Sequence, residues 1–311
     1  MAAQTTELNR EKELFSYAEY RLDASEQTGY SNYSYWRSVW SNFVKKKMTI
    51  AMGIIFLALF LFSFIAGPIG RYQYMNLVPT ESMFELPNRE FWFGTDNLGR
   101  DYWCQVWYAT QTSIKLAALV AVGQCVLGVI VGCIWGYVRS LDGIFTELYN
   151  IMNNIPSIIY MSLIALMVGK SFTIMAVALT LFGWMSMARQ TRNLVLMYRD
   201  REYNLASRCL GTRQSTTLVK NILPYLVSMI VLNVAMGIPR TIGLETTLSY
   251  LGLGLDINTP SLGVLLRNAR SYFMQYPHLL IFPALIVSII TITFYCAGNS
   301  FADACDPKNH V

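Results

Sequence analysis

Charge is scarce in this sequence. Only 14% of its 311 residues are Asp, Glu, Lys or Arg, against about 25% in soluble globular domains. The charged residues are missing from several stretches of about 17 to 23 residues, each long enough to cross about 30 Å of hydrocarbon as a helix. So many stretches of membrane length argue against one large soluble helical core. They predict an all-α, polytopic membrane protein.

Histidine and cysteine are too few, or too scattered, for the common metal and catalytic sites. The chain has two histidines, His278 and His310, and six cysteines without a CxxC pair. This spacing gives neither a zinc-type cluster nor a disulfide framework. No nucleophile elbow accompanies the two histidines, so a Ser-His-Asp arrangement is excluded. We therefore expect no catalytic residue, no metal site and no cofactor in this chain.

Two glycine-containing segments resemble parts of nucleotide-binding loops. Gly169-Lys170-Ser171 matches the end of a phosphate-binding loop, but Ile164 stands where that loop needs its first glycine. Gly252 and Gly254 follow an apolar run, but a third glycine at the dinucleotide-fold spacing is missing. If ATP drives this protein, we expect another subunit to bind it.

Six apolar stretches predict six transmembrane helices. We place five of them at about Met48–Gly67, Leu116–Val138, Ile155–Gly169, Ser171–Ala188 and Leu279–Ala297. The remaining one, the fifth along the chain, starts near Ile222 and runs to about Ile238 or beyond. Asn153, Asn154 and Pro156 interrupt the start of the third stretch. The centre of each stretch lacks an ionisable residue, although proton- and sodium-coupled carriers commonly place one there. The pattern therefore argues against a secondary transporter.

Lys and Arg gather in two of the polar segments. Arg37 and three consecutive lysines precede the first stretch, and seven basic residues lie between the fourth and fifth: Arg189, Arg192, Arg199, Arg201, Arg208, Arg213 and Lys220. Short cytoplasmic loops carry such an excess. This position of the charge, more than the net value of +5, is informative, and it does not indicate nucleic-acid binding. We expect a multi-pass protein of the cell membrane with both termini in the cytoplasm.

The same pattern divides the chain into five segments. They are a cytoplasmic tail (1–47), a first transmembrane helix (48–70), an extracellular segment (71–112), the remaining membrane core (113–300) and a cytoplasmic C-terminal tail (301–311). The aromatic residues of the N-terminal tail predict either an interfacial helix over Tyr30–Phe43 or a mostly disordered segment.

Small residues recur at a helical spacing in the second apolar stretch. Gly128, Gly132 and Gly136 are four residues apart, which puts them on one helix face where another backbone can approach closely. We favour plain helix packing over a helix that gates a pathway.

The basic segment between the fourth and fifth stretches predicts a short helix on a turn. Asp200 to Leu210 has helix-forming, amphipathic character. Gly211 fits the residue that ends a helix, because glycine enters the left-handed conformation at little cost. A second short helix is expected from about Ser215, with Pro224 near the start of the fifth span. Such a helix on a rigid turn can transmit force from a docked partner.

The segment from Glu202 to Pro224 resembles the EAA motif of binding-protein-dependent importer permeases. That motif reads Glu-Ala-Ala, then a glycine four positions after the last alanine, then Ile-x-Leu-Pro or a close variant. Here Leu205-Ala206-Ser207 occupies the first place, Gly211 is the glycine, and Ile222-Leu223-Pro224 ends the motif. The resemblance implies a coupling helix, about 199–215, that docks on an ATPase.

One residue departs from the motif. Leu205 stands where the family usually has glutamate, so a salt bridge from that position is not expected. The resemblance then implies docking by shape and apolar contact, with charge from neighbouring residues. The residues that we assign to ATPase coupling are Arg201, Glu202, Leu205, Ala206, Ser207, Arg208 and Gly211.

Further segments extend the resemblance over most of the chain. Phe93–Asp101 is similar to the Phe-Gly-Thr-Asp-x-x-Gly-Arg-Asp segment of dipeptide and oligopeptide permeases, and Leu248–Gly254 to their Leu-Ser-Phe-Leu-Gly-Leu-Gly element. Thr259–Gly263, Asn153–Pro156 and Ala302–Pro307 also match. Together they resemble the second membrane subunit of oligopeptide or dipeptide ABC importers, of Gram-positive type.

The resemblance implies a type I ABC importer permease fold and a set of partners. A homologous sister permease would complete the heterodimeric pathway, two ABC ATPases would bind ATP and Mg, and an extracellular lipoprotein would deliver the peptide. The chain itself would not be an enzyme. A role beside the pathway or its gate is implied for Leu248, Tyr250, Gly252 and Gly254. The alternatives are a nickel ABC importer permease and, less in keeping with the motifs, a stand-alone secondary carrier.

Overall fold

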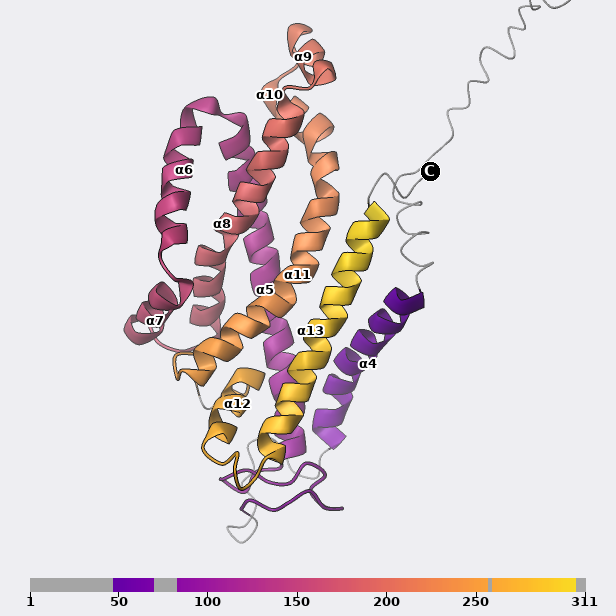
Figure 1. The fold of residues 1–311 in the computed structure, drawn as a ribbon, viewed down its shortest axis with the longest axis vertical. Coiled ribbons are helices and arrows are strands. Elements are labelled where there is room, and N and C mark those ends of the chain that lie inside the picture. Colours follow the sequence, from indigo (N-terminus) through magenta and orange to yellow (C-terminus); the bar gives the residue numbers. More distant parts are fainter. Residues whose placement is uncertain (1–46, 70–82, 257–258, 306–311) are drawn as a thin grey trace, which may run out of the picture. The chain divides into compact units, whose positions relative to one another are not determined.

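A computed structural model of the chain describes residues 47–69, 83–256 and 259–305. Apart from one isolated bridge between Thr95 and Asp101, the regular elements in these ranges are helices, which confirms the all-α prediction. They are α4 (Lys47–Ile69), α5 (Tyr102–Tyr137), α6 (Arg139–Asn154), α7 (Ser157–Met167), α8 (Phe172–Arg199), α9 (Glu202–Cys209), α10 (Gln214–Thr216), the π-helical turn η2 (Thr217–Ile222), α11 (Leu223–Tyr250), α12 (Leu262–Arg270) and α13 (His278–Cys305) (Figure 1). The predicted interfacial helix over Tyr30–Phe43 and residues 306–311 lie outside the described residues.

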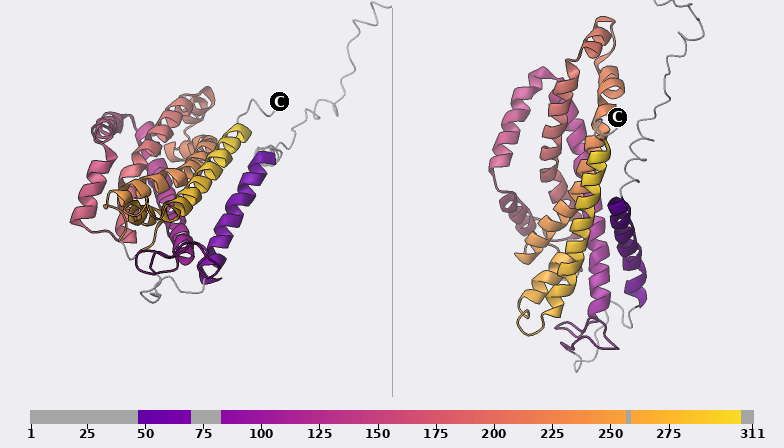
Figure 2. Two further views of the ribbon diagram at one scale, coloured as in Figure 1. Left: turned by 60° about the horizontal axis from the view of Figure 1, so that its bottom comes forward. Right: turned by 45° about the vertical axis from the view of Figure 1, so that its right-hand side comes forward.

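Membrane-length apolar helices dominate the described chain. Five are long and apolar enough to span a bilayer: α4, α5, α8, α13, and α11 together with the helical turns before it. A sixth span is supplied by α6 and α7, which meet at an angle of 81°. In Figures 1 and 2, this pair lies on one side of the bundle and α4 on the other.

The bend between α6 and α7 corrects the predicted third span. Ile155 follows α6 in an extended conformation, with ψ of 121°, because a residue before proline is driven out of the helical region. Pro156 then precedes α7, which has 11 residues and so a length of about 16 Å. α7 lies within the predicted stretch Ile155–Gly169 but is too short to cross alone, and α6 and α7 together have the length and composition of one span.

Several spanning helices extend beyond their predicted ends, and among them α8 continues to Arg199 and α13 to Cys305. α5 begins at Tyr102 and not near Leu116, because the Asp101 carboxylate accepts a hydrogen bond from the Trp103 backbone N–H at 2.9 Å and caps the helix. α11 continues through Pro239 to Tyr250, in keeping with a fifth span that runs beyond Ile238. A proline inside a spanning helix is tolerated when neighbouring helices satisfy the freed carbonyl.

The predicted glycine stripe packs α5 on α8. A Cβ atom added at Gly128 would lie 2.6 Å from Met187 Cβ, and one at Gly132 would lie 2.5 Å from the Ala188 carbonyl oxygen. Carbon atoms in contact need about 3.5 Å, so only glycine allows this approach. The packing interpretation is confirmed.

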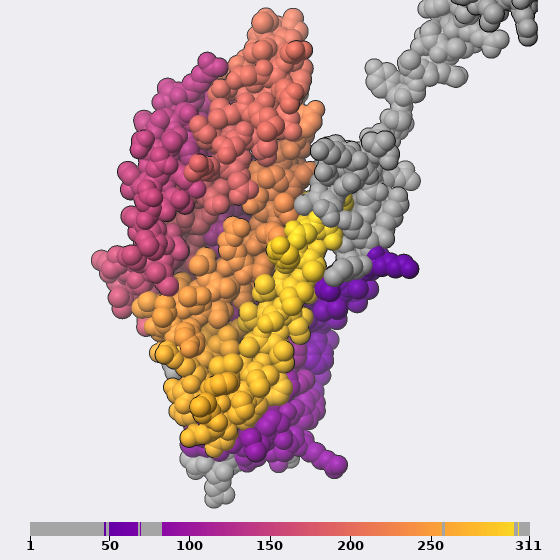
Figure 3. All heavy atoms as spheres, viewed as in Figure 1, coloured from indigo at the N-terminus to yellow at the C-terminus, as the bar shows by residue number. Residues whose placement is uncertain are grey.

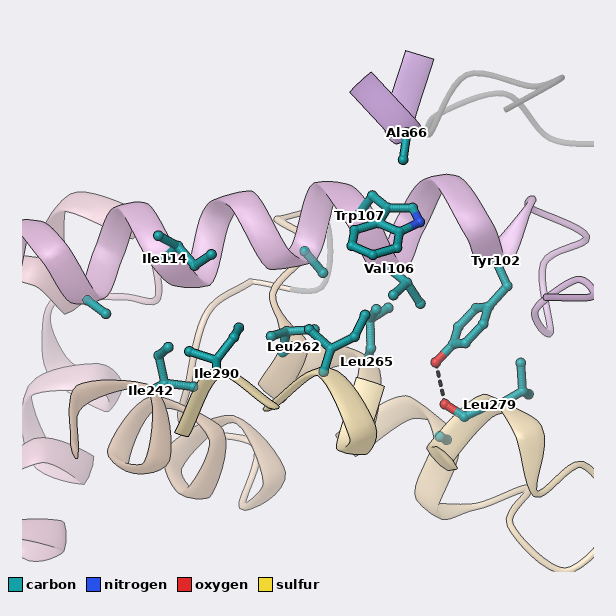
Figure 4. Packing of buried hydrophobic residues seen from close by; sticks show 14 residues of the cluster. Ala66, Tyr102, Val106, Trp107, Ile114, Ile242, Leu262, Leu265, Leu279 and Ile290 are labelled. Atoms are coloured by element: carbon teal, nitrogen blue, oxygen red, sulfur yellow. Dashed lines mark hydrogen bonds between the residues drawn. The ribbon is translucent and has the colours of Figure 1, made fainter. Parts of the chain in front are cut away.

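A buried apolar cluster joins α4, α5, α11, α12 and α13 (Figure 4). Trp107 and Ile114 of α5 belong to it, together with Ile242 of α11. The Tyr102 hydroxyl donates a hydrogen bond to the Leu279 carbonyl oxygen at the start of α13. Leu262 and Leu265 of α12 also belong to this cluster, and α12 lies at the end of the bundle opposite α9 (Figure 1).

Candidate functional site

Helix α9 lies at one end of the bundle, between α8 and the helical turns that lead into α11 (Figure 1). It has eight residues and falls within the predicted helix over Asp200–Leu210. Residues 200–213 project beyond the ends of the neighbouring spanning helices (Figure 3). We call this segment the knob.

Gly211 ends α9 in a Schellman turn. Its N–H donates to the Arg208 carbonyl at 2.9 Å, and the Thr212 N–H donates to the Ser207 carbonyl at 3.1 Å. Its φ of +82° belongs to the left-handed region, as predicted for a helix stop. In the part of the chain that the structure describes, no atom other than those of the adjacent residues lies within 4 Å of the position its Cβ would occupy. Backbone conformation, and not crowding within this chain, therefore requires glycine here.

Two asparagines attach α9 to the spanning helices. Asn204 is fully buried, and its amide donates to the Tyr198 carbonyl of α8 at 2.9 Å. Its Oδ1 accepts from Nδ2 of Asn221 in η2, also at 2.9 Å. Movement of α9 would therefore pull on α8 and on the start of α11 together. Sequence analysis gave Asn204 no role, since a polar residue in a short polar helix is usually solvent-facing.

Charged side chains interact where the knob joins α8, at Arg199 and Asp200. The Asp200 carboxylate accepts from the Arg199 Nη2 at 3.1 Å, and lies 3.8 Å from Arg139. The hydrogen bond from Arg199, followed by the charges of Arg199, Arg139 and Arg208, holds the pKa of Asp200 below its ordinary value. Arg199 is buried and also donates to the Gly136 carbonyl of α5 at 2.8 Å. The base of the knob thus touches α5 as well as α8.

Arg208 points back toward this base. Its guanidinium donates to the Arg199 carbonyl, lies 3.7 Å from the Asp200 carboxylate and sits 5.7 Å from the centre of the Tyr137 ring. The predicted contact of Arg208 with an ATPase stays a prediction. Arg201 and Glu202 are exposed on the knob.

The knob exposes a group of apolar side chains beside its charged ones. Leu210 is 87% exposed, Tyr203 45% and Leu205 44%, and Ala206 is exposed between them. Clustered exposed apolar side chains mark interaction surfaces. Leu205, the departure from the motif, belongs to this surface, while Ser207 is only half-buried. The arrangement can bind a partner through shape and apolar contact.

Pro224 lies in the first turn of α11. The helical turn η2 leads directly into α11, and the Leu223 N–H donates to the Leu218 carbonyl five residues back. The π-helical turn therefore stands next to the proline, as is common where a proline interrupts the regular hydrogen bonds of a helix. The residue therefore fits the start of the fifth span, as predicted.

The Leu-Gly-Leu-Gly segment ends α11 at the opposite end of the bundle. The Gly252 N–H donates to the Ser249 carbonyl at 2.9 Å and the Leu253 N–H to the Leu248 carbonyl at 2.8 Å, with φ of +81° at Gly252. This is a second Schellman turn. Gly254 packs on Ser249, where an added Cβ would lie 1.9 Å from the hydroxyl oxygen.

The predicted gate residues therefore occupy different environments. Leu248 and Gly254 are buried, whereas Tyr250 is exposed with the Arg270 guanidinium 4.8 Å from the centre of its ring. Lys170 donates to the Gly252 carbonyl at 2.6 Å and ties the turn to the segment before α8. Their role beside a pathway stays a prediction.

A carboxyl group is buried beside this turn. Oε1 of Glu245, in α11, accepts from the Ser249 hydroxyl at 2.7 Å and from the Ser261 hydroxyl at 2.6 Å. Ser261 also caps α12 by accepting from the Val264 N–H at 3.1 Å. Glu245 lies in the part of α11 beyond Ile238 and so outside the centres of the apolar stretches, for which the absence of an ionisable residue was predicted. Sequence analysis gave Glu245 no role.

Replacing Glu245 by alanine should destabilise the permease, because two buried serine hydroxyls would lose their acceptor. Each buried polar group left unpaired costs about 1–3 kcal/mol. Glu245→Gln keeps an oxygen at the same place and should retain most of the stability. Thermal unfolding in detergent would measure the difference. An alanine variant as stable as the wild type would contradict the assigned link between α11 and α12.

Five spanning helices, a bent pair that supplies a sixth, and a projecting knob define a helical membrane permease. Residues 126–311 match the family model of binding-protein-dependent transport system inner membrane components. Residues 34–87 match the N-terminal transmembrane domain of oligopeptide transport permease C. The chain belongs to the family of binding-protein-dependent transport system inner membrane components.

Full-length relatives agree with this assignment. The chain is 35% identical to the oligopeptide transport system permease protein AmiD of Streptococcus pneumoniae, over 96% of this chain and 98% of the relative. It is 31% identical to the oligopeptide transport system permease protein OppC of Bacillus subtilis, over 96% and 98%. It is 32% identical to the dipeptide transport system permease protein DppC of the same species, over 88% and 86%. The predicted resemblance is confirmed: the chain is a multi-pass ABC permease, and its relatives are transport proteins and not enzymes.

Proposed function

We propose that this chain is one of two permease subunits of an ATP-driven peptide importer. It forms half of the translocation pathway and converts closure of the ATPases into the switch between inward-open and outward-open states. The observation that carries this proposal is the knob. It exposes apolar side chains for docking, and it is attached to α8 and η2 by the hydrogen bonds of Asn204 and to α5 by Arg208 over the Tyr137 ring.

The partners follow from the same proposal. A homologous sister permease supplies the other half of the pathway, and two ABC ATPases bind ATP and Mg and dock on the knobs. An extracellular lipoprotein delivers the peptide. Both termini and the knob lie in the cytoplasm, which agrees with the basic residues of the knob and its flanks.

Peptide is the cargo that the relatives favour. AmiD, OppC and DppC are named for oligopeptides or dipeptides, and none of these names refers to nickel. A stand-alone carrier would have no use for a surface such as the knob. Neither alternative has an observation in its favour.

Leu210→Asp should weaken the ATPase complex. A charge would replace the most exposed apolar side chain of the knob, at 87% exposure, and loss of a central apolar contact typically costs about 1–2 kcal/mol of binding. Co-purification of the ATPases with the tagged permease would measure this loss.

Met274→Asp is the matched control. Met274 is 91% exposed and lies between α12 and α13, at the end of the bundle away from the knob. It should leave ATPase recovery unchanged. Full recovery with Leu210→Asp, or equal loss with both variants, would contradict docking through the knob.

A further inference from the structure

An arginine interrupts the apolar length of α11. Arg240 lies ten positions before the helix end at Tyr250, or about 15 Å along the axis, which is about half the thickness of the hydrocarbon core. Its side chain is exposed. None of the ion pairs found among the described residues includes it. A charge at this depth is costly and typically faces a polar cavity or a substrate pathway.

Arg240 lines a cavity of about 300 Å³ beside the bend between α6 and α7. This volume is at the lower end of the range for small-ligand pockets. Asn153 and Pro156 contribute from the bend, Ser186 from α8 and Gln124 from α5. A smaller neighbouring cavity of about 20 Å³ shares Arg240 and extends toward Asn233. Helices from both halves of the chain therefore meet around one space lined by polar and apolar side chains.

The lining has one charge and several neutral hydrogen-bonding groups. Arg240 is the charged residue among the side chains that line the two cavities, and no Asp or Glu is among them. Amides and hydroxyls, such as those of Gln124, Ser186 and Thr241, can pair with the backbone of a peptide whatever its sequence. The guanidinium fits the carboxylate that ends every linear peptide, because it can donate two parallel hydrogen bonds.

We propose that Arg240 binds the C-terminal carboxylate of the peptide as it passes through this cavity. The inference rests on the proposed peptide import and deepens it, since it names the group of the cargo that the chain recognises. It also gives the charge in α11 a function. Because all linear peptides end in a carboxylate, Arg240 would bind them without selecting among their side chains. A carboxylate of the sister permease is the competing partner for the same guanidinium.

Uptake by the complete reconstituted importer separates these partners. One peptide is offered with a free C-terminus and, in parallel, as its C-terminal amide. Arg240→Gln should raise the KM for the free acid about tenfold or more and leave the KM for the amide close to its wild-type value. The KM of each peptide form is compared between the variant and the wild-type importer, and both contain the same binding protein. A preference of the binding protein for one form therefore does not affect the comparison. Lys115→Gln, an exposed cation of α5 near the Phe64 ring, is the matched control and should change neither KM.

Two further results define the outcome. Arg240→Lys keeps the charge but cannot donate two parallel hydrogen bonds, so it should raise the KM less, and again only for the free acid. If the Arg240→Gln importer does not assemble, Arg240→Lys is the variant that tests the proposal. Equal losses for acid and amide would assign Arg240 to the sister permease and overturn the proposal, as would unchanged kinetics. A wild-type importer that takes up neither form would instead refute the proposed peptide import, and this inference with it.

Discussion

Gly211→Trp should abolish ATP-driven peptide uptake while the permease remains inserted and folded. The left-handed φ of +82° costs a non-glycine residue about 1–2 kcal/mol, and this strain is confined to an exposed turn. Apart from the two adjacent residues, no atom of the described residues lies within 4 Å of the Cβ position, so the indole would project into the space that the ATPase needs. Uptake into proteoliposomes, with the amount of folded permease measured alongside, tests this expectation.

Gly211→Asn is the matched variant for this test. Asparagine tolerates the left-handed region better than other non-glycine residues and is much smaller than tryptophan. We expect it to retain a substantial part of the uptake. Full uptake by Gly211→Trp would show that no partner approaches the turn, and would remove the knob from the coupling mechanism.

Arg208→Glu should uncouple ATP hydrolysis from uptake. The substitution removes the hydrogen bond to the Arg199 carbonyl and puts a second carboxylate beside Asp200, where the arginine is now 3.7 Å away. Partly exposed ion pairs contribute at most about 1 kcal/mol, so the fold should survive while the knob loses its fixed orientation. We expect the peptide imported per ATP hydrolysed to fall about fivefold, which corresponds to about 1 kcal/mol.

The reversed pair tests how Arg208 acts. If it braces the knob from within the chain, Asp200→Arg combined with Arg208→Glu should restore part of the coupling, as interacting neighbours do in double-mutant cycles. Recovery would be partial, because Asp200 also contacts Arg199 and Arg139. A double variant as uncoupled as Arg208→Glu alone would mean that Arg208 acts on the ATPase directly.

The sequence predicted those features that depend on local patterns. Apolar length located the spanning helices, the four-residue glycine spacing predicted the packing of α5 on α8, and Gly211 marked the end of α9. Each of these signals depends on backbone geometry or composition within a few turns of helix. They need no knowledge of what lies across the fold.

The predicted late start of α5 and the missing role for Glu245 have a common physical cause in partners that are distant in sequence. The first turns of α5 look too polar for a bundle core, but Gln111 donates to the Ser63 carbonyl of α4 at 2.6 Å. Likewise, Glu245 is accommodated in α11 by Ser261, sixteen positions away. A hydropathy profile scores each such residue as if it faced lipid or water, and does not include a hydrogen-bond partner on another helix. Their burial becomes visible only when the helices are placed together.

The most direct measurement uses the native Cys209, an exposed thiol on α9. In membranes that contain the complete importer, a short thiol-reactive cross-linker attached there should capture an ABC ATPase, identified by mass spectrometry. Leu210→Asp should reduce the yield, and Cys209→Ser should eliminate it. Failure to capture an ATPase from an importer that is actively transporting peptide would contradict coupling through the knob.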